Sequence, residues 1–186
     1  MKIVTHQQIE LCRKWNRIAQ KQVFEILYPP MFRIVQRYLV NTTQAEDCVM
    51  RGMMKVFQQM DSFKFQGEHS LYLWSRRIII NEALMDLRKR NNFYLLTEED
   101  FIELPDSTEL LNEIDAEEIL HLIIGLPVGY RTVFNLYVIE EFSHKEIAQM
   151  LGINESTSKT QYRKAKIKLK EMLLNNKNSF YGKYRK

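Results

Sequence analysis

The stretch from Phe142 to Lys170, FSHKEIAQMLGINESTSKTQYRKAKIKLK, constrains the fold of this chain more than any other part of the sequence. Its first half predicts a short helix, because Ile147, Ala148 and Leu151 fall on one side of a helix of 3.6 residues per turn. Gly152 then predicts a tight turn, since a residue without Cβ adopts a positive φ at little cost. A second helix is expected to follow this turn.

That second helix combines an apolar stripe with many cations. Tyr162, Ala165 and Leu169 are spaced i, i+3 and i+7, which predicts a buried face. No acidic residue lies between Glu155 and Glu171. The cations in this interval are Lys159, Arg163, Lys164, Lys166, Lys168 and Lys170. Two helices joined by a short glycine turn, the second one basic, are typical of the helix-turn-helix that reads the major groove of DNA.

The charge distribution bears on two alternatives that share this local pattern, a solvated helical hairpin and a surface that docks an acidic partner. Residues 1–90 carry 15 Lys and Arg against 8 Asp and Glu. Residues 91–130 carry 10 acids and no Lys or Arg, and residues 131–186 carry 12 cations against 5 acids. Two basic blocks separated by an acidic one favour two polyanion-binding modules and a connector that DNA repels.

Several classes of protein are excluded by the rest of the composition. Cys12 and Cys48 lie in helix-like stretches, so neither a disulfide framework nor a zinc site is expected. The longest apolar run, around Ile78–Ile80, ends at Asn81 and is too short to cross a membrane. The N-terminus lacks the apolar core of a signal peptide, and no P-loop, nucleophile elbow or Cys/His pair is present. We therefore expect a cytoplasmic protein that is not an enzyme and binds no cofactor or metal.

Helical patterns fill most of the chain, because glycine (6 residues) and proline (4 residues) are scarce and no long alternating pattern predicts a strand. Pro29-Pro30 is expected to end the first helix. The predicted helices span residues 6–28, 31–40, 44–60, 71–90, 108–125 and 127–140, followed by the two helices described above. The expected fold is all-α, with two small helical domains at residues 6–92 and 111–176 joined by a flexible acidic linker at residues 93–110.

The first domain has its own pattern of aromatic and basic residues. The loop before the helix at 71–90 contains Phe63, Lys64 and Phe65, and the helix contains Trp74 and ends in the basic cluster 88–90. Aromatic rings among cations suit single-stranded DNA, because every base offers a face for stacking while the cations follow the phosphates. For Trp74 and Phe63 the core is favoured over base stacking, since large aromatic residues are usually buried. The basic cluster also complements the negative end of its helix.

The order of the motifs along the chain resembles that of the extracytoplasmic-function sigma factors, bacterial proteins that give core RNA polymerase its promoter recognition. The motifs are AEDCVMRGMMKVF, FQGEHSLYLWSRRIIIN and DLRKR, then an acidic linker, then LPVGYRTVFNLYVIEEFSHKEIAQMLGI and STSKTQYRKAKIKL. The resemblance covers about residues 20–174 and implies two helical domains, sigma regions two and four.

The resemblance also implies roles for particular residues. The residues that would dock on the clamp helices of the polymerase β′ subunit are Asp47, Met50, Arg51, Met54 and Phe57. Those that would bind the single strand of the minus-ten element are Phe65, Gly67, Ser70, Trp74, Arg77 and Asn81. Those that would read the minus-thirty-five element in the major groove are Ser158, Lys159, Thr160, Gln161, Arg163 and Lys164. The implied partners are core RNA polymerase, through β′ and the β flap, promoter DNA, and a cognate anti-sigma factor.

The chain departs from the family pattern on the predicted docking helix. The family usually has Gln-Glu where this chain has Met50-Arg51, so a charge is reversed there. The loop from Asp61 to Gly67 is also longer than usual by about two residues, and Ser158 replaces a small apolar residue. A stand-alone helix-turn-helix regulator, with residues 1–90 used to dimerise or to sense a ligand, is the alternative reading of the same sequence.

Overall fold

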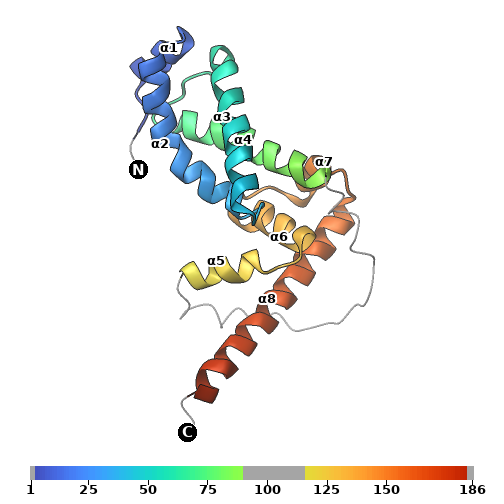
Figure 1. The fold of residues 1–186 in the computed structure, drawn as a ribbon. Helices are drawn as coiled ribbons and strands as arrows, with labels where there is room; N and C mark the ends of the chain where they lie inside the picture. The colour runs from blue at the N-terminus through green and yellow to red at the C-terminus, as the bar shows by residue number, and fades with distance from the viewer. Residues whose placement is uncertain (1–2, 90–115, 184–186) are drawn as a thin grey trace. The chain divides into compact units, whose positions relative to one another are not determined.

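The computed structural model describes residues 3–89 and 116–183, with side chains over residues 3–89 and 119–175 (Figure 1). Within these ranges the regular structure is entirely helical, which confirms the all-α prediction. The chain divides into two compact units, Met1–Arg90 and Asn91–Lys186. The predicted linker at 93–110, and the start of the helix predicted at 108, lie outside the described residues. Each unit is considered by itself below.

The first unit packs four α-helices and one turn of 3₁₀ helix around an apolar core. Its elements are α1 (His6–Arg13), α2 (Arg17–Gln36), α3 (Thr42–Gln58), η1 (Met60–Ser62) and α4 (Ser70–Lys89). Polar side chains set the first three helix starts, because Thr5, Asn16 and Asn41 each accept a hydrogen bond from a backbone N–H in the first turn.

The first helix differs from the prediction in where it breaks. The chain turns between α1 and α2 at Trp15, whose φ is 56°, and Asn16 starts α2 by accepting from Ala19 N at 3.0 Å. The helix then continues through Pro29 and Pro30, which were expected to end it. Two prolines remove backbone donors, but the buried row of α2 extends on both sides of them, so packing holds the helix together.

The crossing of α3 and α4 is very close. A Cβ built on Gly52 of α3 would lie 2.5 Å from Ile79 Cγ1 and 3.4 Å from Ile79 Cα on α4. Only glycine therefore lets these two backbones approach to this distance. Two ion pairs, Arg51 with Asp86 and Lys55 with Glu82, join the same two helices beside the crossing.

The second unit contains the helices that follow the acidic stretch. Its elements are α5 (Ala116–Ile124), α6 (Val128–Phe134), a π-helical turn η3 (Asn135–Ile139), α7 (His144–Leu151) and α8 (Glu155–Lys183). Pro127 precedes α6 as its N-cap, as expected for a proline that opens a helix. α7, its turn and α8 form the predicted helix-turn-helix, and α8 continues beyond residue 176.

A buried arginine joins α5 to α6. The Arg131 side chain is 6% exposed, and its Nη1 donates to the carbonyl oxygens of Ile124 (2.8 Å) and Leu126 (3.1 Å). These carbonyls end α5, where the helix dipole favours a cation. Burial lowers the pKa of Arg131 from its usual value. Arg131 thus has a structural role, because it holds the end of α5 against α6.

Candidate nucleic-acid interface

The turn between α7 and α8 has the geometry that its sequence predicts. Ser143 caps α7 in a reciprocal capping box with Glu146. Gly152 ends α7 in the left-handed conformation, with φ 69° and ψ 35°, and Ile153 N donates to Ala148 O at 3.1 Å. Ile147, Ala148 and Leu151 are buried, as predicted. These contacts fix the direction in which α8 leaves the turn.

The outward face of α8 carries the cations nearest to the turn. Lys159 is exposed, and Thr160, Arg163 and Lys164 are partly exposed. At 100° per residue Arg163 lies opposite the fully buried Ala165, Lys159 and Thr160 lie beside Arg163, and Lys164 lies at the edge of this face. Lys159 Nζ lies 2.7 Å from Glu155 Oε1 one turn earlier, and this hydrogen bond lowers the pKa of the exposed Glu155 carboxyl. Arg163 is therefore the cation at the centre of the outward face, whereas Lys159 is paired with Glu155.

The structure removes two of the predicted reading residues from this face. Ser158 is completely buried, and its Oγ lies 2.9 Å from His144 Nδ1 on α7. Gln161 is 9% exposed, and its Oε1 has no hydrogen-bond partner within the described residues. The inner face of α8 runs through Ser158, Gln161 and Ala165, while Tyr162 is only half-buried. Apolar periodicity missed this register because two of the inward residues are polar.

A cluster of rings holds α8 against the rest of the unit. His144 stacks on Tyr137 with ring centroids 4.3 Å apart and an interplanar angle of 10°. The Tyr162 ring lies 4.6 Å from Tyr137 and 5.8 Å from His144, and Lys166 Nζ lies 5.4 Å from the Tyr162 centroid. The cluster joins η3, α7 and α8, so it orients the outward face. The spacing of these residues in the sequence gave no signal for it.

Protonation of His144 should weaken this cluster. Burial, and then the charge of Lys159, lower the pKa of His144, while Glu155 raises it to a lesser extent. A histidine whose pKa is lower in the folded state loses folding stability as the pH falls through its unfolded value, about 6.5. We expect the melting temperature of the second unit to fall as the pH is lowered from about 7.5 to 5.5, followed by circular dichroism. NMR titration of the His144 ring should give a pKa below 6.5.

The control for this prediction is His144→Phe, which keeps a ring against Tyr137 but cannot titrate. Its melting temperature should depend less on pH than that of the wild type. His121→Gln, at an exposed position of α5, should leave the wild-type dependence in place. An unchanged pH dependence in His144→Phe would show that other groups cause it.

The predicted single-strand residues of α4 share one face of the helix. Ser70, Trp74, Arg77 and Asn81 are spaced i, i+4, i+7 and i+11. Arg77 and Asn81 are exposed, and Ser70 and Trp74 are partly exposed. Ser70 Oγ donates to Gly67 O at 2.6 Å and accepts from Gln66 N at 3.1 Å, so it closes the loop that begins the face.

The aromatic residues of this region divide between the core and the surface. Phe63 is 3% exposed and belongs to the core, while its ring lies 5.1 Å from the half-buried Trp74. Phe65 is 38% exposed, and its ring meets His6 of α1 edge-on at 4.9 Å. Gly67, with φ 110°, turns the chain between Phe65 and α4. Trp74 and Phe65 therefore keep part of their surface exposed, whereas Phe63 does not.

Two surface residues of the same face were missed by the sequence reasoning. Leu73 is 54% exposed and Met85 is 41% exposed, although both side chains are apolar. They flank Arg77 and Asn81 on the helix surface. Both lie away from the buried row through Ile79 around the axis of the helix, and this position could have identified them as surface residues from the sequence.

The predicted docking residues lie on one face of α3. Asp47 and Arg51 are exposed, Met50 and Met54 are 48% and 58% exposed, and Phe57 is half-buried. The positive charge that departs from the family pattern is already matched inside the unit, because Arg51 pairs with Asp86 of α4. This face therefore presents two thioethers and one carboxylate around an internally paired arginine.

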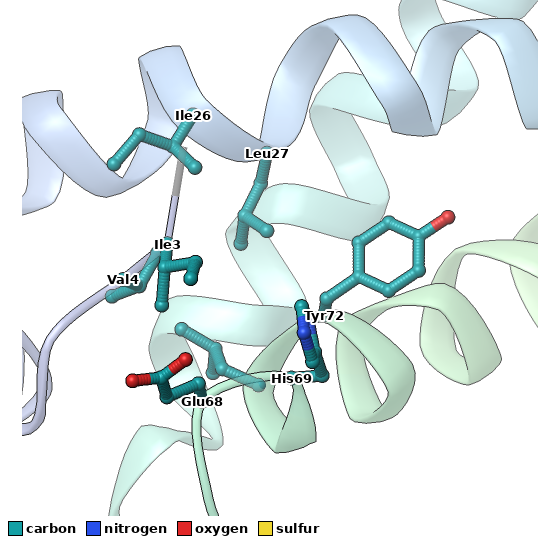
Figure 2. Close-up of a pocket in the computed structure, with 8 residues that line it drawn as sticks. Ile3, Val4, Ile26, Leu27, Glu68, His69 and Tyr72 are labelled. Carbon is teal, nitrogen blue, oxygen red and sulfur yellow. The ribbon is translucent and has the colours of Figure 1, made fainter. Parts of the chain in front are cut away.

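Figure 2 shows a small hollow beside the start of α4. Ile3, Val4 and residues of α2 form one side, and Glu68, His69 and Tyr72 form the other. It has room for about one water molecule, far less than the several hundred Å³ of typical ligand pockets. The faces of α4 and α8 are thus better candidates for recognition than this hollow.

Cys12 and Cys48 are buried free thiols, and burial raises their pKa values to about 11 and about 12. No group of metal-ligating side chains occurs among the residues that the structure describes. None of the described helices is long and apolar enough to span a membrane.

The fold and these two faces define a helical protein with a helix-turn-helix and a second candidate nucleic-acid surface. The family model for sigma-70 region 2 matches residues 23–93, and the model for sigma-70 region 4 matches residues 116–169. Together they cover well over half of the chain. The chain belongs to the sigma-70 family of RNA polymerase sigma factors.

Individual relatives agree with this assignment. The ECF RNA polymerase sigma factor SigW of Bacillus subtilis is 25% identical over 188 residues, which cover 93% of this chain and 98% of that protein. The sigma factor SigM of Mycobacterium tuberculosis is 24% identical over 158 residues, covering 85% of this chain and 79% of SigM. The sigma factor RpoE of Bartonella quintana, solved with the anti-sigma factor NepR, has the same fold with a TM-score of 0.50 at 23% identity, covering 83% of this chain and 96% of RpoE.

Proposed function

We propose that this protein directs promoter-specific initiation of transcription as an extracytoplasmic-function sigma factor, without enzymatic activity of its own and in the cytoplasm. The observation that carries the proposal is the presence of two different candidate DNA-binding faces on two units of one chain. One is the cationic outward face of a helix-turn-helix, and the other is an aromatic and polar face on α4. A stand-alone regulator would need only the first face.

The proposed division of labour follows from the chemistry of each face. Residues 111–176 read the minus-thirty-five duplex through Lys159, Thr160, Arg163 and Lys164, because charged and hydroxyl groups reach base edges and phosphates in the major groove. Residues 6–92 bind the melted minus-ten strand through the rings and amide on α4, where bases stack outside the duplex. Residues 93–110 form the linker between these domains.

Polymerase docking is proposed for the face of α3. Met50 and Met54 supply adaptable apolar contact area, and Asp47 supplies a charge at its edge. Because Asp86 already pairs with Arg51, the partner surface on β′ does not need to neutralise that arginine. The β flap is proposed as a second contact for residues 111–176, and an anti-sigma factor is a further proposed partner.

The two weak DNA-binding faces should act together only when the polymerase holds both promoter elements at a fixed spacing. The isolated protein is therefore expected to bind promoter DNA poorly, and the complex with core polymerase is expected to initiate from defined sites. Run-off transcription on genomic DNA with purified core enzyme, followed by mapping of the start sites, tests this expectation.

Shared upstream elements at a constant spacing would support the proposal. Either of two results would instead favour the stand-alone regulator. One is initiation that does not require both the core enzyme and this protein. The other is tight and specific promoter binding by the protein alone. Co-purification with core polymerase provides an independent check on the same alternative.

A further inference from the structure

The turn between α1 and α2 carries an exposed apolar surface that the proposed function does not use. Trp15 is 62% exposed, Ile18 is 72% exposed and Leu11 is 37% exposed. All three precede residue 23, where the match to sigma-70 region 2 begins. Exposed tryptophan is uncommon on a protein surface, because the ring gains much from burial.

The backbone of Trp15 adds a second observation. Its φ of 56° is in the left-handed region, where a bulky residue is a genuine outlier. The turn is fixed on both sides, since Trp15 N donates to Cys12 O and Asn16 N donates to Leu11 O, each at 3.0 Å. Glycine would adopt this conformation without strain. Folding alone therefore does not account for a tryptophan here, and strained residues of this kind cluster at binding sites.

Cations flank Trp15 along the chain. Lys14, Arg17 and Lys21 are exposed, and no acidic residue occurs between Glu10 and Glu25. Lys21 forms an ion pair with Glu25 at 3.8 Å, whereas no carboxylate of the described chain pairs with Lys14 or Arg17. An exposed aromatic residue with an exposed cation on each side of it in the sequence suits a base and its flanking phosphates.

The turn is also connected to the proposed single-strand face. Arg13, immediately before it, donates to the carbonyl oxygens of Met60 (3.3 Å) and Phe63 in the loop ahead of α4. The Phe63 ring in turn lies 5.1 Å from Trp74. At the other end of α1, His6 meets Phe65. α1 is thus fixed to the same loop that presents the α4 face.

We propose that Trp15, with Lys14 and Arg17, forms a further contact for single-stranded DNA that extends the strand path of the α4 face. The inference rests on the proposed function, because it concerns the strand that α4 binds. Trp15 stacks on a base, the two cations contact its flanking phosphates, and Ile18 wedges against the neighbouring base step. A protein partner with an acidic surface would also cover this exposed turn. Such a partner gives no reason for the Arg13 hydrogen bonds that fix α1 to the loop before α4.

The test uses the full-length protein and a fluorescein-labelled oligo(dT) of about 12 nucleotides, within the usual site sizes for single strands. Trp15→Gly removes the ring and suits the backbone, so it should fold at least as well as the wild type. We expect it to raise the Kd measured by anisotropy at about 50 mM salt by about 5- to 100-fold. Trp15→Phe, which keeps a ring, should restore most of the affinity.

Val40→Ala is the matched control, because Val40 is also an exposed apolar residue (52%) but lies just before the N-cap of α3, outside the proposed surface. It should bind oligo(dT) as the wild type does. The double substitution Lys14→Ala with Arg17→Ala should make the slope of log K against log salt concentration shallower by about 0.7 for each lost phosphate contact.

Run-off transcription by each variant with core polymerase separates the two levels of the proposal. If the wild type does not initiate, the proposed function fails. The inference about Trp15 is wrong if the wild type initiates but Trp15→Gly binds oligo(dT) as tightly as the wild type does. It is also wrong if the wild type shows no measurable binding to oligo(dT). Loss of core polymerase binding in Trp15→Gly, with oligo(dT) binding unchanged, would assign the surface to a protein partner and would also overturn it.

Discussion

Replacing Arg163 with alanine is expected to reduce run-off transcription from a cognate promoter by about 5- to 100-fold. This is the effect expected from the loss of one good bidentate contact to a base. Arg163 lies on the outward face of α8, opposite the buried Ala165. Lys159→Ala should have a smaller effect, because Glu155 already engages the Lys159 ammonium group at 2.7 Å. The measurement is transcription from promoters that carry each base substitution in the minus-thirty-five element.

The control is Lys168→Ala, further along the same helix. Lys168 is exposed and its Nζ contacts Glu171 Oε2 at 3.0 Å, so its loss changes the charge of α8 without touching the proposed reading surface. An equal loss of transcription in Lys168→Ala would mean that only net charge matters. A loss in Arg163→Ala that is the same for every promoter sequence would make Arg163 a phosphate contact and not a base contact.

Gly52→Ala is expected to destabilise the first unit by about 1–3 kcal/mol, the usual effect of overpacking a well-packed core. The sign is informative, because glycine to alanine in the middle of a helix normally stabilises it by about 1 kcal/mol. The added Cβ would lie 2.5 Å from Ile79 Cγ1 and close to the backbone of α4. Urea unfolding followed by tryptophan fluorescence measures the change, since Trp15 and Trp74 both belong to this unit.

A double-mutant cycle with Ile79→Ala tests the stated cause. Ile79→Ala removes the Cγ1 atom that the new Cβ would meet, so Gly52→Ala should cost less in that background than in the wild type. Additive effects of the two substitutions would place the strain elsewhere. A Gly52→Ala variant more stable than the wild type would contradict the close crossing of α3 and α4.

The pairing of Arg51 explains how a departure from the family pattern fits the fold. The sequence showed a reversed charge on the predicted docking helix, but α4 supplies Asp86 as its partner. The pair is partly exposed, so its contribution to stability is modest. Its main consequence is chemical, since it leaves Met50 and Met54 as the most exposed apolar groups of that face.

Much of the second unit could be predicted from local sequence. Ser143, Glu146 and Gly152 act within a few residues of their own positions, so the start and end of α7 follow from the order of side chains. The register of α8 did not follow, because Ser158 and Gln161 face inward beside Ala165. Polar residues turn inward when a partner from another helix is present, as His144 is for Ser158.

The first unit shows the same division between local and long-range causes. Neither the passage of α2 through Pro29 and Pro30 nor the turn at Trp15 followed from the spacing of apolar residues. Helix breaking by proline is a local cost of about 3 kcal/mol, and burial of the row along α2 offsets it. The shared face of Ser70, Trp74, Arg77 and Asn81, in contrast, has a local cause, because it follows from their spacing along one helix.

The sequence by itself determined the helical class, the helix-turn-helix and the order of the sigma motifs, because capping, periodicity and charge act over a few residues. Tertiary structure alone decided which polar residues of α8 face inward, which acid neutralises Arg51, and how closely α3 approaches α4 at Gly52. It also left Trp15 exposed on a strained turn. These features depend on contacts between helices distant in sequence, and no local pattern encodes such contacts.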